Sequence, residues 1–453
     1  MITISSIEEY QAKCASLISN YQLQQKNKSS IQLKKNTSNL FRHRKQSNNK
    51  LDARSFNKVL QIDLDKKIVY AEGMITFADL VDATLQHGFL PAVVPELKTI
   101  TLGGAVAGIG IESSSFIHGL VHEAIIELDI LTGNGDIITA NKDNEHKDLF
   151  LGFPNSYGTL GYTLRAAMRL IPCSKYIKLT HKKFNDTNQY YQAIQDYCTA
   201  NTGDKSKFID GSIFNDELKI LTTAECVSNE DLNASKYTYN HIYYKSIQTK
   251  QTDYLSTHDY IWRWDSDWFW CSKTFGMENI ILRLILGKWL LKSKSYWKVK
   301  SWFDRHPTIL KLYNSLSKRR EQIIQDVVIP WEHAEAFYIF FRDNIGITPL
   351  WNCPVRSTET KFTFFPLEPN KLYINFGFWS SIVSDKPDGH FNRLIEQEVT
   401  KLNGHKSLYS TVHYTEEEFW SMYDQDKYNK LKDRYDPKGN LANLYTKCTT
   451  TST

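Results

Sequence analysis

The chain has 453 residues, 41% of them hydrophobic, so it can bury two cores and is longer than one ordinary domain. Its formal net charge of +5 is modest for this length and gives no reason to expect a nucleic-acid partner. The seven cysteines form no Cys-x-x-Cys pair, which argues against a disulfide framework and a structural zinc site, and no metal is expected. The N-terminus lacks the basic and apolar regions of a signal peptide, so free thiols in the cytoplasm are expected.

The first part of the chain alternates between periodic and polar segments. Residues 1–20 predict a short amphipathic helix with Ser6 as N-cap and two glutamates in its first turn. Residues 22–50 are rich in Gln, Asn, Ser, Lys and Arg, a composition typical of a disordered linker. The patterns that follow predict two strands and a helix, at 59–63, 68–72 and 77–87.

A hairpin is predicted further along, between the apolar runs 125–131 and 136–140. The residues between them include Gly133-Asn134-Gly135. Asn-Gly is a strong signal for a two-residue turn, because both residues tolerate positive φ.

The stretch 91–115 places glycine and serine in what otherwise reads as buried backbone. Glycines without a Cβ let the main chain turn through positive φ and approach a bulky group. Successive amide N–H groups then form a nest that suits a pyrophosphate, while the serines add hydroxyls and two isoleucines cover an aromatic ring system. The residues concerned are Gly103, Gly104, Gly108, Ile109, Gly110, Ile111, Ser113, Ser114 and Ser115. This mixture fits a flat, partly apolar dinucleotide.

A nicotinamide-type Rossmann fingerprint is the competing interpretation of the same stretch. Gly108-Ile-Gly110 is followed by Ser113 at the third-glycine position, and no long helix pattern opens there, so the strand–turn–helix context fails. A glycine-rich hairpin loop would explain a lone glycine pair. Four glycines, three serines and two prolines in one window favour a ligand instead.

Tryptophan and lysine are concentrated in the segment 254–303, which holds seven of the 11 tryptophans. The apolar run 280–291 is interrupted by Arg283 and Lys288 and is shorter than the ~20 residues that span a bilayer, so no transmembrane helix is predicted. Lysines interleaved with aromatics follow it, a composition that suits a surface of anionic lipid. The alternative is a buried helix with a solvated, lysine-rich end.

Several motifs, in the same order along the chain, resemble those of the PCMH-type FAD-binding flavoproteins of the vanillyl-alcohol-oxidase superfamily. The run 95–115 is most similar to the branch of the sterol Δ24 reductases. Further similar motifs lie at Gly119, 127–140, 148–150, 158–161, 171–172, 176–179, 417–420 and 428–431. The chain resembles equally closely, at 37–42, 259–264 and 267–271, a group of bacterial relatives. These accompany methyltransferases that act on unsaturated phospholipid acyl chains. The resemblance covers most of the chain from about residue 34 onward.

The resemblance implies an α+β protein in three parts. A two-part PCMH-type FAD-binding domain is expected at 1–175, and a cap or substrate domain at 176–400, with an antiparallel sheet flanked by helices. The remaining segment, 401–453, is expected to return to the FAD domain.

The resemblance also implies which residues contact FAD. Thr37, Ser38 and Asn39 belong to the first cofactor loop, although this sequence lacks the glycines that many members carry there. The other expected contacts are Pro95, Glu96, Leu97, Thr101, Gly103, Gly104, Gly108, Gly110, Ile111, Glu112, Ser113, Ser114, Gly119, Gly158 and Gly161. Histidyl-flavin members carry their attachment histidine at the position of Ile111, so FAD is expected to be held noncovalently, with His118 as an ordinary loop residue.

The activity that the resemblance implies is reduction of a carbon–carbon double bond in a lipid, with NADPH or NADH as electron donor. An isolated alkene has no carbonyl to accept charge, so protonation must precede or accompany hydride transfer from flavin N5. The pocket therefore needs one positioned acid among apolar and aromatic side chains. The candidates are Tyr409, His413, Tyr414 and Glu418.

Three alternatives stay open at this point. The lipid is a sterol side chain or a methylene-bearing or unsaturated fatty acyl chain, reached by peripheral contact with a membrane surface. The same fold and cofactor also serve an oxidase or dehydrogenase that acts on a hydroxyl or desaturates a lipid. A third hypothesis is a flavin- and lipid-binding protein without turnover.

Overall fold

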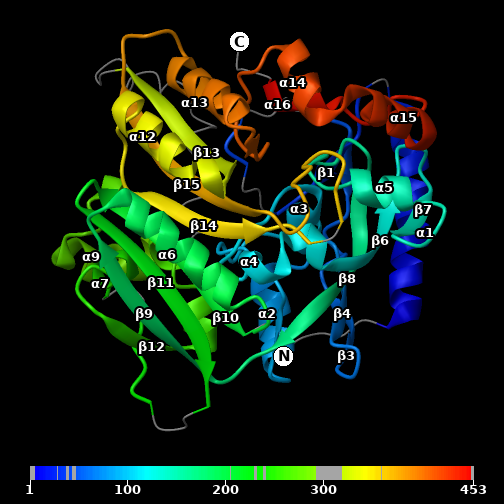
Figure 1. The fold of residues 1–453 in the computed structure, drawn as a ribbon. Helices are drawn as coiled ribbons and strands as arrows, with labels where there is room; N and C mark the ends of the chain where they lie inside the picture. The colour runs from blue at the N-terminus through cyan, green and yellow to red at the C-terminus, as the bar shows by residue number, and fades with distance from the viewer. Residues whose placement is uncertain are drawn as a thin grey trace.

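The computed structural model describes residues 6–27, 29–36, 40–42, 47–204, 206–228, 232–237, 241–291, 319–358 and 360–449, without the side chains of 274–275 and 286–290. Two large antiparallel sheets and one short parallel strand pair organise this part of the chain, with helices packed around them (Figure 1). The α+β class predicted from the sequence is confirmed.

The first large sheet comes from the N-terminal part of the chain. Its path runs through β3 (Val59–Asp63), β4 (Ile68–Glu72), β8 (Tyr162–Pro172), β6 (Ile125–Leu131) and β7 (Ile137–Asn141), and β5 (Phe89–Pro91) also pairs with β8. The strands predicted at 59–63 and 68–72 are confirmed. Alternation of period two marks β4, where Val69 and Ala71 are fully buried.

The strands β6 and β7 form the predicted hairpin, but with a different turn. The Thr132 N–H donates to the Asp136 carbonyl (2.9 Å) and the Gly135 N–H to the Thr132 carbonyl (3.1 Å), so the loop has three residues. Among these only Gly135 has a positive φ, +95°. The predicted two-residue turn is therefore wrong. Its physical reason is tertiary, since Tyr21 and Asn440 both donate hydrogen bonds to the Gly133 carbonyl, each at 2.9 Å, and hold it in the loop.

Helices at the N-terminal end largely follow the predictions. Helix α1 (Ile7–Gln24) begins at the predicted N-cap, where Ser6 Oγ accepts the Glu9 N–H at 3.1 Å, and it continues beyond residue 20. Helix α2 (Phe77–Leu85) is confirmed and ends two residues before the predicted end. The polar region 22–50 is structured in part: β1 (Gln32–Lys34) pairs in parallel with β2 (Lys50–Asp52), which a linker composition does not suggest.

The second large sheet has eight strands and lies beside the first. Its order is β12 (Thr252–Ser256), β9 (Tyr176–Phe184), β11 (Leu218–Val227), β10 (Lys207–Asn215), β14 (Leu350–Arg356), β15 (Leu372–Val383), β13 (Arg320–Pro330) and β16 (His405–Lys406). Helices α6 (Thr187–Ala200), α12 (Ala334–Asn344) and α13 (His390–Lys401) pack against this sheet (Figure 1). An antiparallel sheet flanked by helices was expected here, whereas the domain boundaries at 175 and 400 stay predictions.

Short elements complete the fold. In chain order they are α3 (Leu102–Ala107), α4 (Ser115–His118), η1 (Val121–Ala124), α5 (Lys147–Gly152), α7 (Tyr243–Ser246), α8 (Thr257–Ile261), η2 (Asp265–Asp267), η3 (Cys271–Phe275), α9 (Ile280–Leu290) and η4 (Trp331–His333). The C-terminal helices are α14 (Glu416–Tyr423), α15 (Gln425–Tyr435) and α16 (Leu444–Thr449). Among the described helices, none combines the length and the apolarity that a bilayer crossing requires.

The C-terminal helices pack beside the first sheet, although the chain has just left the second. Figure 1 shows α15 next to α5 and β7. The Tyr435 carbonyl accepts the Asn134 N–H at 3.0 Å, and the Tyr435 hydroxyl donates to Asp148 at 2.8 Å. Lys432 Nζ donates to the Thr159 carbonyl at 3.2 Å.

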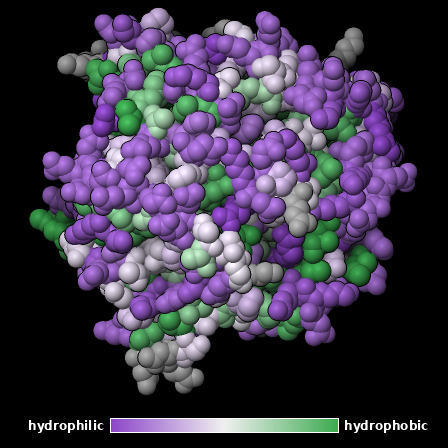
Figure 2. Space-filling model, viewed as in Figure 1, coloured by the Kyte–Doolittle hydropathy of each residue, from purple (hydrophilic) through white to green (hydrophobic). Residues whose placement is uncertain are grey.

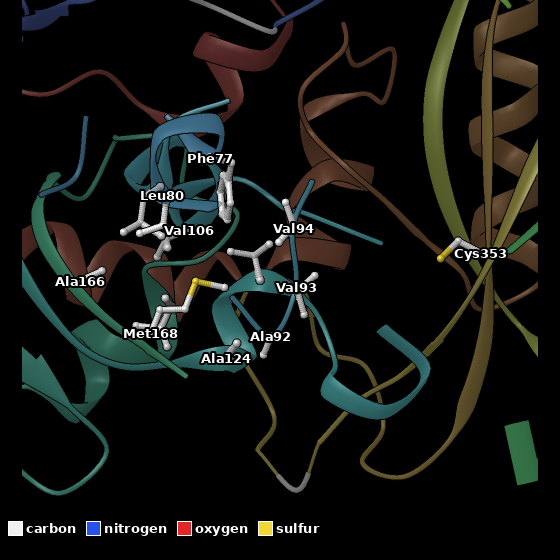
Figure 3. Close-up of a cluster of buried hydrophobic side chains, with 14 of the residues drawn as sticks. Phe77, Leu80, Ala92, Val93, Val94, Val106, Ala124, Ala166, Met168 and Cys353 are labelled. Atoms are coloured by element: carbon white, nitrogen blue, oxygen red, sulfur yellow. The ribbon is translucent and has the colours of Figure 1, made fainter. Parts of the chain in front are cut away.

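One buried apolar cluster runs from the first sheet into the second. Figure 3 shows its N-terminal portion, where Phe77 and Leu80 of α2 lie with Val106 and Met168. The same cluster includes buried residues of β9, β14 and the 260–270 region. The two sheets therefore share a continuous core.

The tryptophan-rich segment is divided between core and surface. Trp262, Trp264, Trp268 and Trp270 are buried, so these four serve packing rather than a membrane interface. The side chain of Trp289 and all of Trp297 and Trp302 lie outside the described residues.

Candidate functional site

The glycine stretch forms the short helix α3 rather than an open loop. The Gly104 N–H donates to Thr101 Oγ1 at 3.3 Å, so Thr101 caps the helix. A Cβ at Gly103 would meet the Gly73 carbonyl oxygen and Thr163 Cβ at 2.9 Å, so this glycine lets the helix rest on the first sheet. None of Gly103, Gly104, Gly108 and Gly110 has a positive φ. The positive φ expected at these four positions is therefore wrong, because the chain uses the missing Cβ for close packing.

Glycines after α3 divide between packing and turning. A Cβ at Gly108 would approach the Tyr157 ring at 3.3 Å, and one at Gly110 would meet Pro95 at 3.1 Å. Positive φ is found instead at Gly119 (+72°), Gly158 (+77°) and Gly161 (+146°). These three glycines follow the stretch 91–115, and their positive φ is what requires glycine there.

Serine hydroxyls expected to face a ligand are bonded within the protein. Ser113 Oγ donates to Glu112 at 2.6 Å and lies 3.0 Å from the Tyr260 hydroxyl. Ser114 Oγ donates to the Ala92 carbonyl at 2.8 Å, and Ser115 Oγ accepts the Glu112 N–H at 3.1 Å. Their hydroxyls shape the stretch, so any contact of these residues with a dinucleotide is left to the main chain.

A buried charge cluster ties the glycine stretch to the second sheet. Arg263 Nη2 lies 3.0 Å from Glu112, 2.8 Å from Asp210 of β10 and 3.6 Å from Glu96. Burial, followed by the negative charge of Glu112, raises the pKa of Glu96 well above its usual range. Glu96 and Glu112, both expected near the cofactor, thus act on the position of the loop.

Two further residues expected to contact FAD, Leu97 and Ile111, make ordinary structural contacts. Leu97 is half-buried, and its carbonyl accepts the Ile100 N–H at 3.0 Å. Ile111 packs against the buried cluster that contains Leu120 and Val355.

The segment 155–158 packs against the glycine stretch, and its own backbone is strained. Asn155 and Tyr157 have φ of +64° and +49°, which is uncommon for Asn and rare for a bulky residue such as Tyr. The Tyr157 N–H donates to the Ala107 carbonyl at 2.8 Å, which fixes the ring beside Gly108. Strain of this kind collects at ligand sites, because surrounding packing must hold it in place.

Arg42 supplies a buried cation to the same place. Its guanidinium lies 5.2 Å from the centre of the Tyr157 ring, and Nη1 donates to the Lys447 carbonyl. Arg42 is 8% exposed, and its Nε and Nη2 have no hydrogen-bond partner among the described residues. Ser156 Oγ and Ser410 Oγ, in adjoining segments, are also buried without a partner in that part of the chain. A cation with two free donors beside the glycine stretch fits the pyrophosphate of FAD.

The first cofactor loop is described only at its end. Thr37, Ser38 and Asn39 lie outside the described residues. Phe41 pairs with Ser410, and the Phe41 N–H donates to the Tyr409 carbonyl at 2.9 Å. Arg42 belongs to the run 37–42 that resembles the family, so extending the predicted contacts by three residues would have found it.

Tyr409 is the catalytic candidate that lies beside these loops, and it is paired with a residue that sequence reasoning missed. Its hydroxyl lies close to the carboxyl of Asp326 on β13, and it accepts the Trp379 Nε1–H at 3.1 Å. The Phe41 and Tyr409 rings meet edge to face with centroids 6.0 Å apart. Asp326 stands in a strand of mostly apolar residues, and that placement is the signal that could have revealed it.

Asp326 is held in an environment that favours its proton. Burial raises its pKa to about 6, although hydrogen bonds from Asn375 and Tyr409 oppose the shift. Asn375 Nδ2 donates to Asp326 Oδ1 at 2.8 Å. The residue opposite on β15 is Gly377, where a Cβ would come within 2.7 Å of Asp326 and 2.6 Å of Trp379. The missing side chain leaves room for both groups.

The other three catalytic candidates are held by structural contacts away from this pair. Tyr414 is buried and donates to the Glu396 carbonyl at 3.2 Å. The His413 ring lies against Gly389, and the backbone N–H of His413 donates to the Glu396 carboxylate at 3.0 Å. Glu418 forms a capping box with Thr415 at the start of α14 and an ion pair with Arg393.

Comparisons with known proteins show what the chain is similar to. Residues 15–141 match the family described as FAD binding domain. The chain is 26% identical to the Delta(24)-sterol reductase of Homo sapiens over 409 residues, which cover 86% of this chain and 75% of the relative. It is 25% identical to the Delta(24)-sterol reductase of Arabidopsis thaliana over 436 residues, 88% of this chain and 76% of the relative. Cytokinin dehydrogenase 7 of Oryza sativa is 34% identical over 118 residues, 26% of this chain and 22% of that protein.

The match to an FAD binding domain and the similarity to sterol reductases support an FAD-dependent oxidoreductase. Within this class, this chain is a homologue of the Delta(24)-sterol reductases, at about a quarter identity over most of its length. The resemblance inferred from the sequence is confirmed.

Proposed function

We propose that this protein reduces a carbon–carbon double bond of a lipid, with FAD held noncovalently and a reduced nicotinamide as electron donor. The observation that carries the proposal is the Asp326–Tyr409 pair beside the FAD-binding segments. A carboxyl with a raised pKa, enclosed by aromatic side chains, is what protonation of an isolated alkene requires.

Asp326 is the acid in this proposal. Its proton passes to one alkene carbon, and positive charge develops on the neighbouring, branched carbon. The hydride that completes the addition is the chemistry that reduced FAD supplies when bound. The product has gained one proton and one hydride, and Asp326 regains its proton from solvent. Asn375 orients the carboxyl through its hydrogen bond, and Tyr409 lies beside it.

Aromatic faces near the pair suit the charge that develops. Trp379, which donates to Tyr409, stacks on Phe269 with ring centroids 4.2 Å apart. Trp351 lies 6.5 Å from Trp379, centroid to centroid. Such faces stabilise a cation and remain apolar enough for a sterol side chain or an acyl chain. Both lipid classes meet this requirement.

Anaerobic stopped-flow spectroscopy tests the proposal with the variant Asp326→Asn. The flavin is reduced with NADPH and then mixed with extracted lipids, and the product mass is read for a gain of two hydrogens. We expect reoxidation by lipid to slow about 100-fold or more, since general-acid catalysis contributes that much, with reduction by NADPH unchanged. Glu321→Gln, which alters another buried carboxylate of β13, is the matched control and should reoxidise at the wild-type rate.

Two outcomes would contradict different parts of the proposal. If Asp326→Asn reoxidises as fast as wild type, the acid lies elsewhere. If no lipid reoxidises the wild-type flavin, the protein is not a lipid reductase.

A dehydrogenase is the second candidate, because a carboxyl with a pKa of about 6 is mostly ionised at pH 7 and can accept a proton. The 118-residue match to a cytokinin dehydrogenase points the same way. Rapid reoxidation of the reduced flavin by oxygen, with no bleaching by NADPH, would favour this candidate.

A further inference from the structure

The first half of helix α9 (Ile280–Leu290), whose side chains the structure describes to residue 285, has its polar and apolar sides reversed relative to an ordinary surface helix. Ile280, Ile281, Leu282, Leu284 and Ile285 are 41–65% exposed, whereas Arg283 between them is 1% exposed. A surface helix normally buries its apolar stripe and exposes its charges. We call these five residues the α9 face.

A buried ion pair holds the helix in this orientation. Arg283 Nη1 and Nη2 lie 2.7 and 2.8 Å from the two oxygens of Asp267, and Nη1 also donates to the Met277 carbonyl at 3.1 Å. Asp267 is fixed in turn by Ser272 Oγ at 2.6 Å. Because the arginine is anchored inward by a bidentate contact, the aliphatic side chains are directed outward.

The concentration of apolar surface here is unusual within the described chain. In the whole described part of the chain, eleven large hydrophobic side chains are exposed, and five of these form the α9 face. The other six do not gather in this way: Ile7 and Leu23 lie near opposite ends of α1, and the rest are Leu64, Ile126, Ile339 and Val383. Figure 2 shows a green cluster at the left edge, where Figure 1 places α9. A contiguous apolar patch of this kind marks an interaction site.

Charge in the sequence that surrounds the face indicates the partner. From Lys273 to Lys300 the sequence carries six lysines and a single acidic residue, Glu278. Arg283 is neutralised by Asp267, so the lysines dominate. Exposed aliphatic residues within a lysine-rich sequence complement a bilayer, where acyl chains accept the former and anionic headgroups attract the latter. We propose that the α9 face docks on a lipid bilayer that contains anionic phospholipid.

Packed aromatic residues connect this face with the candidate acid. Asp267, the partner of Arg283, is followed by Trp268, Phe269 and Trp270. Phe269 stacks on Trp379, which donates a hydrogen bond to Tyr409. If the proposed lipid reductase activity holds, docking at α9 brings the bilayer to the side of the molecule from which these aromatic residues lead to the acid. The docking itself does not depend on that activity.

Vesicle flotation of the full chain tests docking without any substrate. The probes are vesicles of phosphatidylcholine alone and of phosphatidylcholine with one quarter phosphatidylglycerol. Wild type is expected to float with both and more strongly with the anionic ones. Ile281→Glu/Ile285→Glu should lower the bound-to-free ratio at least tenfold, because two charges enter the apolar layer. The matched control, Leu64→Glu/Ile126→Glu, changes two exposed residues, one just after β3 and one on β6, and should bind within twofold of wild type.

Three results would overturn docking. The first is that wild type binds neither vesicle, and the second is that the Ile281→Glu/Ile285→Glu variant binds as well as wild type. The third is that wild type sediments as a dimer and this variant as a monomer, which would make the face a contact between copies of the chain. Equal FAD content and circular dichroism of the variants show that the fold is kept. Turnover of detergent-dispersed lipid is measured separately and should be unchanged in the α9 variant. A protein that floats but never reduces lipid would contradict the proposed function and leave docking intact.

Discussion

At the scale of single residues, the candidate site depends on two ionisable groups that the fold removes from bulk water. Arg42 keeps two donor atoms for an anion, since its Nε and Nη2 meet no acceptor in the described chain. Asp326 keeps its proton to higher pH than an exposed aspartate, because burial disfavours the carboxylate. The first group suits binding of a cofactor phosphate, and the second suits proton transfer.

The pKa of Asp326 predicts a pH dependence with a definite sign. A proton donor with a pKa of about 6 is mostly protonated below pH 5 and loses its proton as the pH rises through 6. Reoxidation of the reduced flavin by lipid should therefore be constant below pH 5 and fall about tenfold per pH unit above 6. Stopped-flow measurements between pH 5 and 8 check this, and Asp326→Asn should show no such decline. A rate that rises through pH 6 would instead identify a base and support the dehydrogenase.

At the scale of secondary-structure elements, a helix cap accounts for a residue that the sequence offered as a catalytic candidate. Glu418 stands in the pattern Thr415-x-x-Glu418, and the structure completes this capping box. Thr415 Oγ1 accepts the Glu418 N–H at 3.3 Å, while Glu418 accepts the Thr415 N–H at 2.8 Å. A carboxylate whose oxygens bind the N-terminus of its own helix is not positioned to protonate a substrate.

Substitutions in this capping box should therefore change stability and leave catalysis intact. Thr415→Ala is expected to lower the free energy of unfolding by about 1 kcal/mol, the usual effect of removing an N-cap. Glu418→Gln should keep the rate of flavin reoxidation within twofold of wild type. Thermal unfolding and stopped-flow spectroscopy measure the two quantities. A large loss of rate in Glu418→Gln at unchanged melting temperature would return Glu418 to the catalytic candidates.

At the scale of the whole molecule, the Arg263 cluster joins the glycine stretch to the second sheet. Glu112 comes from the stretch and Asp210 from β10, and both accept from the same guanidinium nitrogen. Removal of the arginine would leave buried carboxylates without their cation, which is among the most costly changes in a protein interior.

Arg263→Met is accordingly expected to destabilise the protein by about 3–5 kcal/mol and to lower its FAD content. The double variant Arg263→Met/Asp210→Asn should recover part of this loss, because one of the orphaned charges is also removed. Urea unfolding and flavin absorbance of the purified proteins measure both effects. Equal stability of the single and double variants would show that Arg263 acts through its packing with Tyr260 rather than its charge.

Local patterns predicted the elements whose cause is local. The alternation of 68–72, the N-cap at Ser6 and the periodicity of 77–85 each depend on neighbouring residues, and each is found in the structure. The hairpin turn at 133–135 was wrong in detail, because Tyr21 and Asn440, far away in the chain, bind its carbonyl.

By itself, the sequence determined the class of protein and predicted the segment that would meet the cofactor, since motifs similar to those of the FAD-binding family follow in the same order along the chain. Only the tertiary structure decided which side chains meet. It placed Asp326 against Tyr409, 83 positions later in the chain, and Arg42 against Tyr157, and it turned the aliphatic face of α9 outward by burying Arg283. The reason is that the pKa of a carboxyl, the free donors of a guanidinium and the exposure of a helix face depend on neighbours that folding brings together.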